Sequence, residues 1–134
     1  DIVNANKNLG RNYQLNGIVV KGAGRGRQIG FPTANIQVEA DLIIPPSGVY
    51  ITQVNYLGVT YNSVTNIGNN PTFKNEESLN IETNIFDFDQ DIYGESMEVI
   101  FFEKIREEKK FKGVDLLIEQ ISKDVQLAKT YHEK

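Results

Sequence analysis

The stretch Val49-Tyr-Ile-Thr-Gln-Val-Asn-Tyr56 is followed by Leu57-Gly58 and then by Val59-Thr-Tyr-Asn-Ser-Val-Thr-Asn-Ile67. Both long runs are rich in β-branched and aromatic residues, which are enriched in strands. Because a glycine stands between the two runs, the stretch predicts a β-hairpin. We therefore expect a fold that is built mainly of β-structure.

Four other segments have strand character, namely residues 13–21, 35–38, 79–88 and 97–102. In the third of them, Ile81, Thr83 and Ile85 alternate with Glu82 and Asn84. This alternation is the period-two pattern of a strand with one buried face. Glu82 and Asn84 are therefore expected on the face opposite the core, which is either solvent or the wall of a cleft.

One helix is predicted near the C-terminus, because apolar residues recur at helical spacing between Val114 and Ala128, and Gly113 suits the N-cap. Residues 1–12 are polar and rich in asparagine, which predicts a linker or a frayed helix end and leaves residues 13–134 as the domain. About six short strands and one terminal helix predict a mainly β fold. We expect a six-stranded antiparallel, Greek-key-like barrel with the C-terminal helix packed on it.

The composition excludes several kinds of site. The chain has no cysteine, so disulfides and thiolate metal sites are excluded, and its single histidine, His132, is expected to lie in solvent.

The net charge of −4 argues against a nucleic-acid partner. No run approaches ~18 apolar residues, so no membrane span is predicted. The first residues lack the features of a signal peptide, and we expect a cytoplasmic protein.

The run Gly22-Ala-Gly-Arg-Gly-Arg-Gln-Ile-Gly-Phe-Pro-Thr-Ala-Asn35 is the first candidate site. Its glycines allow backbone N–H groups to approach an anion, and its arginines can neutralise one. Thr33 and Asn35 then supply a hydroxyl and an amide oxygen, which suit a hard cation bound to a nucleotide. Neither the P-loop nor the dinucleotide fingerprint fits this run. The alternative is a flexible hairpin loop with solvated arginines.

Two further segments could carry chemistry. Glu82 could act as a general base toward a hydroxyl, or it could be an ordinary solvated glutamate on a strand. The run Lys104-Ile-Arg-Glu-Glu-Lys-Lys-Phe-Lys112 has five basic and two acidic residues and could be a solvated connection into the last helix. Arg106 and Phe111 in that run could also offer a planar cation and an aromatic face to a planar ligand.

Taken together, these segments resemble the riboflavin kinase (flavokinase) family, in particular the C-terminal kinase module of bacterial bifunctional FAD synthetases. The resemblance runs from about Leu9 to the last helix, and its matching runs are Leu9–Tyr13, Gly22–Asn35, Pro46–Tyr50, Asn66–Phe73, Glu82 with Asp87–Gly94, and Ile105–Phe111. It implies a six-stranded barrel and transfer of the ATP γ-phosphoryl group to the riboflavin 5′-hydroxyl, which gives FMN and ADP.

The resemblance also implies a role for individual residues. Thr33 and Asn35 would hold Mg²⁺ on the ATP phosphates, and Glu82 would be the general base. The flap over the phosphates would comprise Gly22, Gly24, Gly26 and Arg27. Ile85 and Tyr93 would border the nucleotide, and the mobile loop that closes over the flavin would carry Arg106, Lys109 and Phe111. The family often has a histidine two residues after the glutamate, where this chain has Asn84.

Two other functions compete with the kinase. One is a non-catalytic barrel that binds a flavin or a nucleotide, against which the intact set of Thr33, Asn35 and Glu82 argues. The other is a barrel that binds single-stranded nucleic acid through Arg25, Arg27 and exposed aromatic residues, against which the negative charge argues. Because the chain begins at Asp1 without a methionine, we expect it to be part of a longer protein with an N-terminal FMN adenylyltransferase domain.

Overall fold

The computed structural model describes residues 2–20, 33–38, 44–71, 77–88, 90, 92–109 and 111–133. Its elements are, in chain order, α1 (Ile2–Leu9), β1 (Tyr13–Val20), β2 (Ala34–Gln37), β3 (Gly48–Tyr56), β4 (Val59–Pro71), β5 (Glu77–Ile85), β6 (Ser96–Arg106) and α3 (Val114–His132). The predicted helix is confirmed, with Gly113 at its N-cap.

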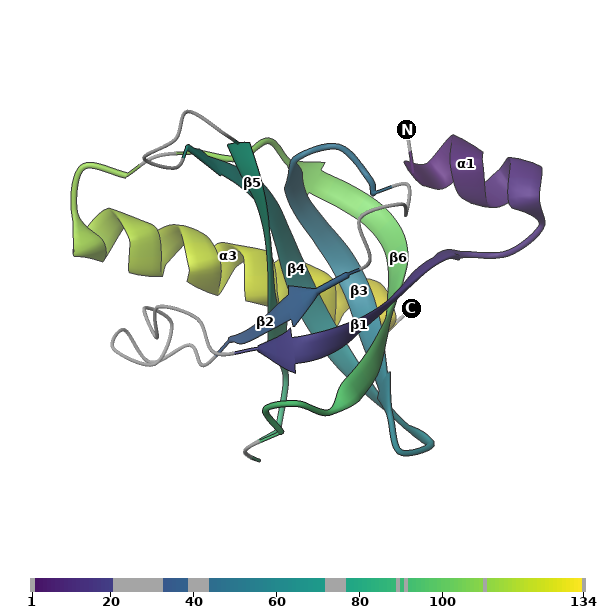
Figure 1. Ribbon diagram of the computed structural model, residues 1–134. Helices are drawn as coiled ribbons and strands as arrows, with labels where there is room; N and C mark the ends of the chain where they lie inside the picture. The colour runs from purple at the N-terminus through teal and green to yellow at the C-terminus, as the bar shows by residue number, and fades with distance from the viewer. Residues whose placement is uncertain are drawn as a thin grey trace.

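The strands form a closed barrel in the order β1-β2-β5-β4-β3-β6, and all neighbouring strands are antiparallel. Figure 1 shows α3 lying along one side of this barrel and α1 at the opposite side. The predicted six-stranded antiparallel barrel with a C-terminal helix is therefore confirmed. Because β2 pairs with β5, strands that are distant in the sequence lie side by side.

The hairpin on which the prediction rests joins β3 to β4, with Tyr56 opposite Val59. Leu57 and Gly58 form its turn, with φ of 50° and 79°. Two positive φ angles are typical of a type I′ turn, whose twist matches that of the flanking strands. Two strands are longer than the sequence predicted: β4 continues to Pro71, and β6 continues to Arg106. The stretch that we expected to be a connection therefore begins as a strand.

Two apolar clusters hold the fold together. All six strands contribute to the cluster inside the barrel, whose buried members include Leu15, Val19, Ile36, Tyr50, Val54, Ile67, Ile81, Met97, Val99 and Phe101. The second cluster lies on the outer wall, where Val49, Ile51 and Val64 pack with Ala128 of α3. Helix α3 thus covers one side of the barrel from the outside.

A ladder of hydroxyl groups crosses the buried interior face of three strands. Thr52 Oγ1 lies 2.7 Å from Ser63 Oγ and 2.8 Å from Thr65 Oγ1, which in turn lies 3.0 Å from Thr83 Oγ1. All four residues are fully buried. Such groups are tolerated in a core because they satisfy one another.

The ladder predicts a stability effect. Thr65→Val keeps the shape of the side chain but removes the hydroxyl that joins Thr52 to Thr83, so we expect the free energy of unfolding to fall by about 1–3 kcal/mol. Urea denaturation measures the change. Thr60→Val on the same strand is the control, because its hydroxyl bonds Asn55 on the exposed surface, and its effect should stay within about 0.5 kcal/mol. Equal effects of the two variants would contradict the role of the buried ladder.

Both ends of the chain differ from expectation. Residues 2–9, which we expected to be a linker or a frayed helix end, form a helix that packs on the barrel, with Ile2 buried in its core. Asn6 fixes this helix, since its Nδ2 donates to the Phe101 carbonyl and its Oδ1 accepts from the Tyr13 N–H.

The expectation that His132 lies in solvent is wrong. Its Nε2 lies 3.1 Å from the Thr52 carbonyl oxygen, and its ring packs edge-on against Phe102.

Candidate active site

Asn35 and Glu82 are direct cross-strand neighbours, although 46 residues separate them in the sequence. Glu82 of β5 is also directly opposite Asn66 of β4, and Asn66 is opposite Val49 of β3. Side chains at directly opposite positions project from the same face of a sheet. Since Val49 packs against α3 on the outer wall, this row of residues lies on the outer wall beside that helix.

The Glu82 carboxylate is held in place by its own strand. Asn80, two residues earlier on the same face, donates from Nδ2 to Glu82 Oε1 over 3.1 Å. Ile81 and Thr83 on either side are buried in the interior, so the backbone cannot turn Glu82 inward without exposing them. Glu82 itself is partly buried, and it could accept a proton from a ligand hydroxyl that approaches the outer wall.

Asn35 lies in β2 and Thr33 directly precedes this strand, so if the chain is extended there the two side chains share a face. Among the described residues, no group of three His, Cys, Asp or Glu is placed to hold a metal ion. Thr33 and Asn35 would offer a divalent cation a hydroxyl and an amide oxygen, and ligand phosphates would supply further oxygens. This donor set fits a hard cation such as Mg²⁺.

Residues 22–32 of the glycine-rich run lie outside the described residues, and these include the predicted phosphate contacts Gly22, Gly24, Gly26 and Arg27. The run nevertheless connects β1 to β2, and Val20 at the end of β1 pairs with Asn35. The end of β1, from which the chain enters the run, is thus beside the Asn35–Glu82 pair. This placement agrees with one site for phosphates and metal, while the individual contacts stay predictions.

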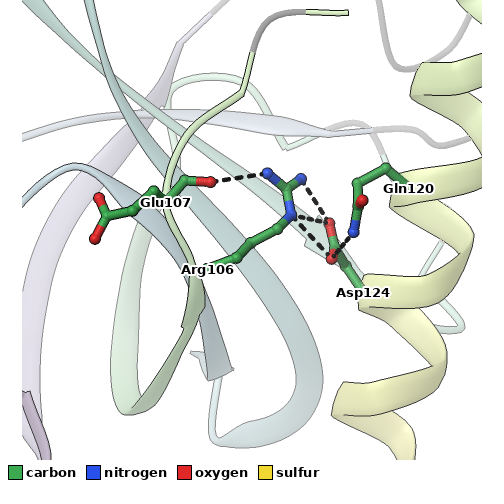
Figure 2. Close-up of polar contacts among 4 residues, drawn as sticks. All are labelled: Arg106, Glu107, Gln120 and Asp124. Atoms are coloured by element: carbon green, nitrogen blue, oxygen red, sulfur yellow. Dashed lines mark hydrogen bonds and ion pairs between the residues drawn. The ribbon is translucent and has the colours of Figure 1, made fainter.

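Arg106 does not lie on a loop, as we had expected, but is the last residue of β6. Figure 2 shows its guanidinium directed at Asp124 of α3: Nε lies 3.1 and 3.2 Å from the two carboxylate oxygens, and Nη2 lies 2.8 Å from Oδ2. Gln120 donates to the same carboxylate, and Arg106 Nη1 donates to the Glu107 carbonyl. The guanidinium is therefore engaged by the helix, and a role in flavin binding stays a prediction.

The segment after β6 runs over the outer face of β4. The Glu108 carboxylate occupies the space above Gly68, so that a Cβ at this position would collide with it. Gly68 is two residues after Asn66 and faces the same side of β4. Phe111 lies with its ring centroid 5.9 Å from Arg106 Cζ, whereas Lys109 is exposed. The predicted flavin-covering segment thus lies beside the wall that carries Glu82.

Ile85 and Tyr93 occupy different surroundings. Ile85 ends β5 and packs partly against the barrel interior. Tyr93 is 46% exposed and precedes Gly94, whose N–H donates to the Val19 carbonyl near the end of β1. Tyr93 is therefore near the end of β1, where a nucleotide could reach it, while Ile85 could offer its backbone.

The sequence reasoning did not single out Asn66 as a site residue. Its neighbours Thr65 and Ile67 are buried in the interior, whereas Asn66 projects to the outer wall beside Glu82. Nothing in its local pattern distinguishes it from the other asparagines of the same strand, because its importance comes from the register between β4 and β5.

A family model described as flavokinase (riboflavin kinase) matches residues 9–132, which is most of the chain. The chain belongs to the riboflavin kinase family. The bifunctional riboflavin kinase/FMN adenylyltransferase of Bacillus subtilis is 47% identical over 98% of this chain and 42% of the relative. The chain thus spans less than half the length of this relative, whose name includes a second activity.

Two solved structures are similar to this riboflavin kinase family member. A structure described as a macrolide-efflux protein from Streptococcus pneumoniae has a TM-score of 0.90 and 39% identity over 96% of this chain and 42% of that one. Riboflavin kinase from Trypanosoma brucei has a TM-score of 0.65 and 27% identity over 90% and 80% of the two chains. In the part of this chain that the structure describes, neither helix is long and apolar enough to cross a membrane.

Proposed function

We propose that this chain transfers the γ-phosphoryl group of ATP to the 5′-hydroxyl of riboflavin and so forms FMN and ADP. The observation that carries the proposal is the direct pairing of Asn35 with Glu82. This pairing puts the candidate metal ligand next to the candidate base, as a kinase requires. Membership of the riboflavin kinase family supports the same reaction.

In this reaction the 5′-oxygen of the flavin forms a bond to the γ-phosphorus while the bond to the bridging β,γ-oxygen breaks. Glu82 accepts a hydrogen bond from the 5′-hydroxyl, orients its oxygen toward the phosphorus and takes its proton. The hydrogen bond from Asn80 holds the carboxylate in position for this step. General-base catalysis of this kind requires hydrogen-bond reach between the base and the hydroxyl.

Thr33 and Asn35 would hold Mg²⁺ with their oxygen atoms. The bound ion would neutralise charge on the phosphates. The glycine-rich run, which connects β1 to β2, is the candidate for backbone N–H donors to the same phosphates, with Arg27 adding positive charge. On the other side of Glu82, the segment from Glu107 to Phe111 would cover the flavin and exclude water, which limits ATP hydrolysis.

A turnover assay tests the proposal. We expect the purified chain to convert riboflavin to FMN when ATP and Mg²⁺ are supplied, as measured by chromatography of the fluorescent flavins, and to stop when EDTA removes the metal. If folded protein binds riboflavin and ATP but forms no FMN, the kinase proposal is wrong and the non-catalytic flavin-binding barrel takes its place. Mn²⁺ in place of Mg²⁺ tests how strictly the oxygen ligands select the ion.

The bifunctional relative also suggests where FMN goes next. Its name couples riboflavin kinase to FMN adenylyltransferase, and this chain matches 42% of its length. We propose that the FMN formed by this chain is the substrate of such an adenylyltransferase. The adenylyltransferase would be a domain covalently linked to this chain.

A further inference from the structure

Asn66 lies next to Glu82, and no function has yet been assigned to its side chain. It is directly opposite Glu82 across the β4–β5 pair and directly opposite Val49 across the β3–β4 pair. It therefore lies between the candidate base and the side of the barrel that α3 covers. Cβ atoms at directly opposite positions are about 4.5–5.5 Å apart, so one ligand can contact both side chains.

The Asn66 side chain has an unusual feature. Within the described part of the protein, its Oδ1 atom is buried and has no hydrogen-bond partner. Leaving a buried acceptor unpaired is costly, and such groups in proteins call for an explanation. By contrast, Asn62, which lies four residues earlier on the same strand, accepts a hydrogen bond from Gln53 Nε2 over 3.0 Å.

The residues around Asn66 determine which kind of group could donate a hydrogen bond to its Oδ1 atom. The Glu82 carboxylate is an acceptor and, when ionised, cannot donate to Oδ1. Val49 has no polar side-chain atom, and Gly68, two residues farther along β4, has no side chain. The Glu108 carboxylate above Gly68 is, when ionised, another acceptor. The missing partner is therefore a donor that enters from outside the barrel wall. Two adjacent acceptors, one neutral and one charged, suit a ligand with several hydroxyl groups in a row.

We propose that Asn66 binds the polyol chain of the flavin, with Oδ1 accepting a hydrogen bond from one of the hydroxyls that precede the 5′-hydroxyl. This inference rests on the proposed kinase function and adds a specificity residue to it. Asn66 would hold the chain so that its terminal hydroxyl meets Glu82. It would also let the site distinguish a flavin with a polyol chain from the bare ring system.

The test compares two ligands and two substitutions. Riboflavin and lumiflavin, which has the ring system without the polyol chain, are titrated against wild-type protein by flavin fluorescence. Asn66→Leu keeps most of the volume and removes the acceptor, and we expect it to weaken riboflavin binding about tenfold, the equivalent of one charge-neutral hydrogen bond. Its lumiflavin affinity should stay within about twofold of wild type. Asn66→Ala should behave alike, and Asn62→Ala should change neither affinity.

Stability and kinetics separate binding from a structural role. Because Oδ1 is unpaired in the free protein, Asn66→Leu should leave the thermal midpoint unchanged or raise it. The variant should raise KM for riboflavin more than it lowers kcat, and it should leave KM for ATP unchanged. The inference is overturned if the variants lose riboflavin and lumiflavin affinity equally, if they bind riboflavin like wild type, or if they are destabilised without a change in flavin preference. Wild-type protein that binds riboflavin without phosphorylating it would refute the kinase proposal and leave this inference standing.

Discussion

Glu82→Gln is expected to lower kcat for FMN formation by roughly 10²–10⁴-fold, the usual contribution of a general base. The substitution keeps the size of the side chain, and its amide oxygen can still accept the hydrogen bond from Asn80 that fixes Glu82. It removes only the capacity to take the hydroxyl proton. ATP affinity should therefore be preserved, because the metal and phosphate contacts come from the segment around Thr33 and Asn35.

The measurement is the single-turnover rate of FMN formation, with ATP binding followed by titration calorimetry. Glu98→Gln is a matched control: Glu98 is also a partly buried strand glutamate, and its Oε1 accepts a hydrogen bond from Asn55 Nδ2 over 2.9 Å. The control should keep full activity. A Glu82→Gln variant that turned over at the wild-type rate would remove Glu82 from the role of base.

The sequence predicted those features of the fold that depend on local patterns. Alternating and β-branched residues identified the six strands, and the apolar spacing between Val114 and Ala128 identified the last helix. The ends of β4 and β6 were missed because pairing with neighbouring strands, rather than local propensity, keeps them extended. The helix at residues 2–9 was missed for a similar reason, since side-chain contacts of Asn6 and burial of Ile2 hold it on the barrel.

The candidate site was predictable in its residues but not in its arrangement. Thr33, Asn35 and Glu82 have side chains suited to a metal and a proton, and the family resemblance assigns them. That Asn35 pairs with Glu82, and Glu82 with Asn66, depends on the register of strands that are distant in the sequence. A shift of one residue would turn these side chains to the other face. Local patterns do not contain that register, so the position of Asn66 beside Glu82 and the Arg106–Asp124 contact emerged only from the structure.

Asp124→Ala is expected to lower the free energy of unfolding by about 3–5 kcal/mol, the usual cost of removing one partner of a buried ion pair. The side chains of Arg106 and Asp124 are only 15% and 5% exposed. Without the carboxylate, the guanidinium loses three hydrogen bonds and remains as an uncompensated charge against α3. Because domains of this kind are stable by only about 5–15 kcal/mol, the loss should be conspicuous in urea denaturation.

A matched control is Glu119→Ala on the same helix, which removes an exposed pair with Lys123 whose atoms are 3.4 Å apart. Exposed pairs contribute about 0–1 kcal/mol, so this variant should stay close to wild type. A double variant, Arg106→Met with Asp124→Leu, removes both charges and should be more stable than Arg106→Met or Asp124→Leu alone. If the two single effects simply add in the double variant, the pair is not coupled.

The double variant also separates stability from function. Arg106 contacts Asp124 on the helix, the Glu107 carbonyl and the Phe111 ring, so it connects α3 to the segment that passes over β4. Replacing both charges by apolar side chains restores packing but removes these directional contacts. We therefore expect the double variant to fold and yet to have a raised KM for riboflavin, since the segment that would cover the flavin is no longer fixed. Wild-type KM in a folded double variant would show that the ion pair supports the fold alone.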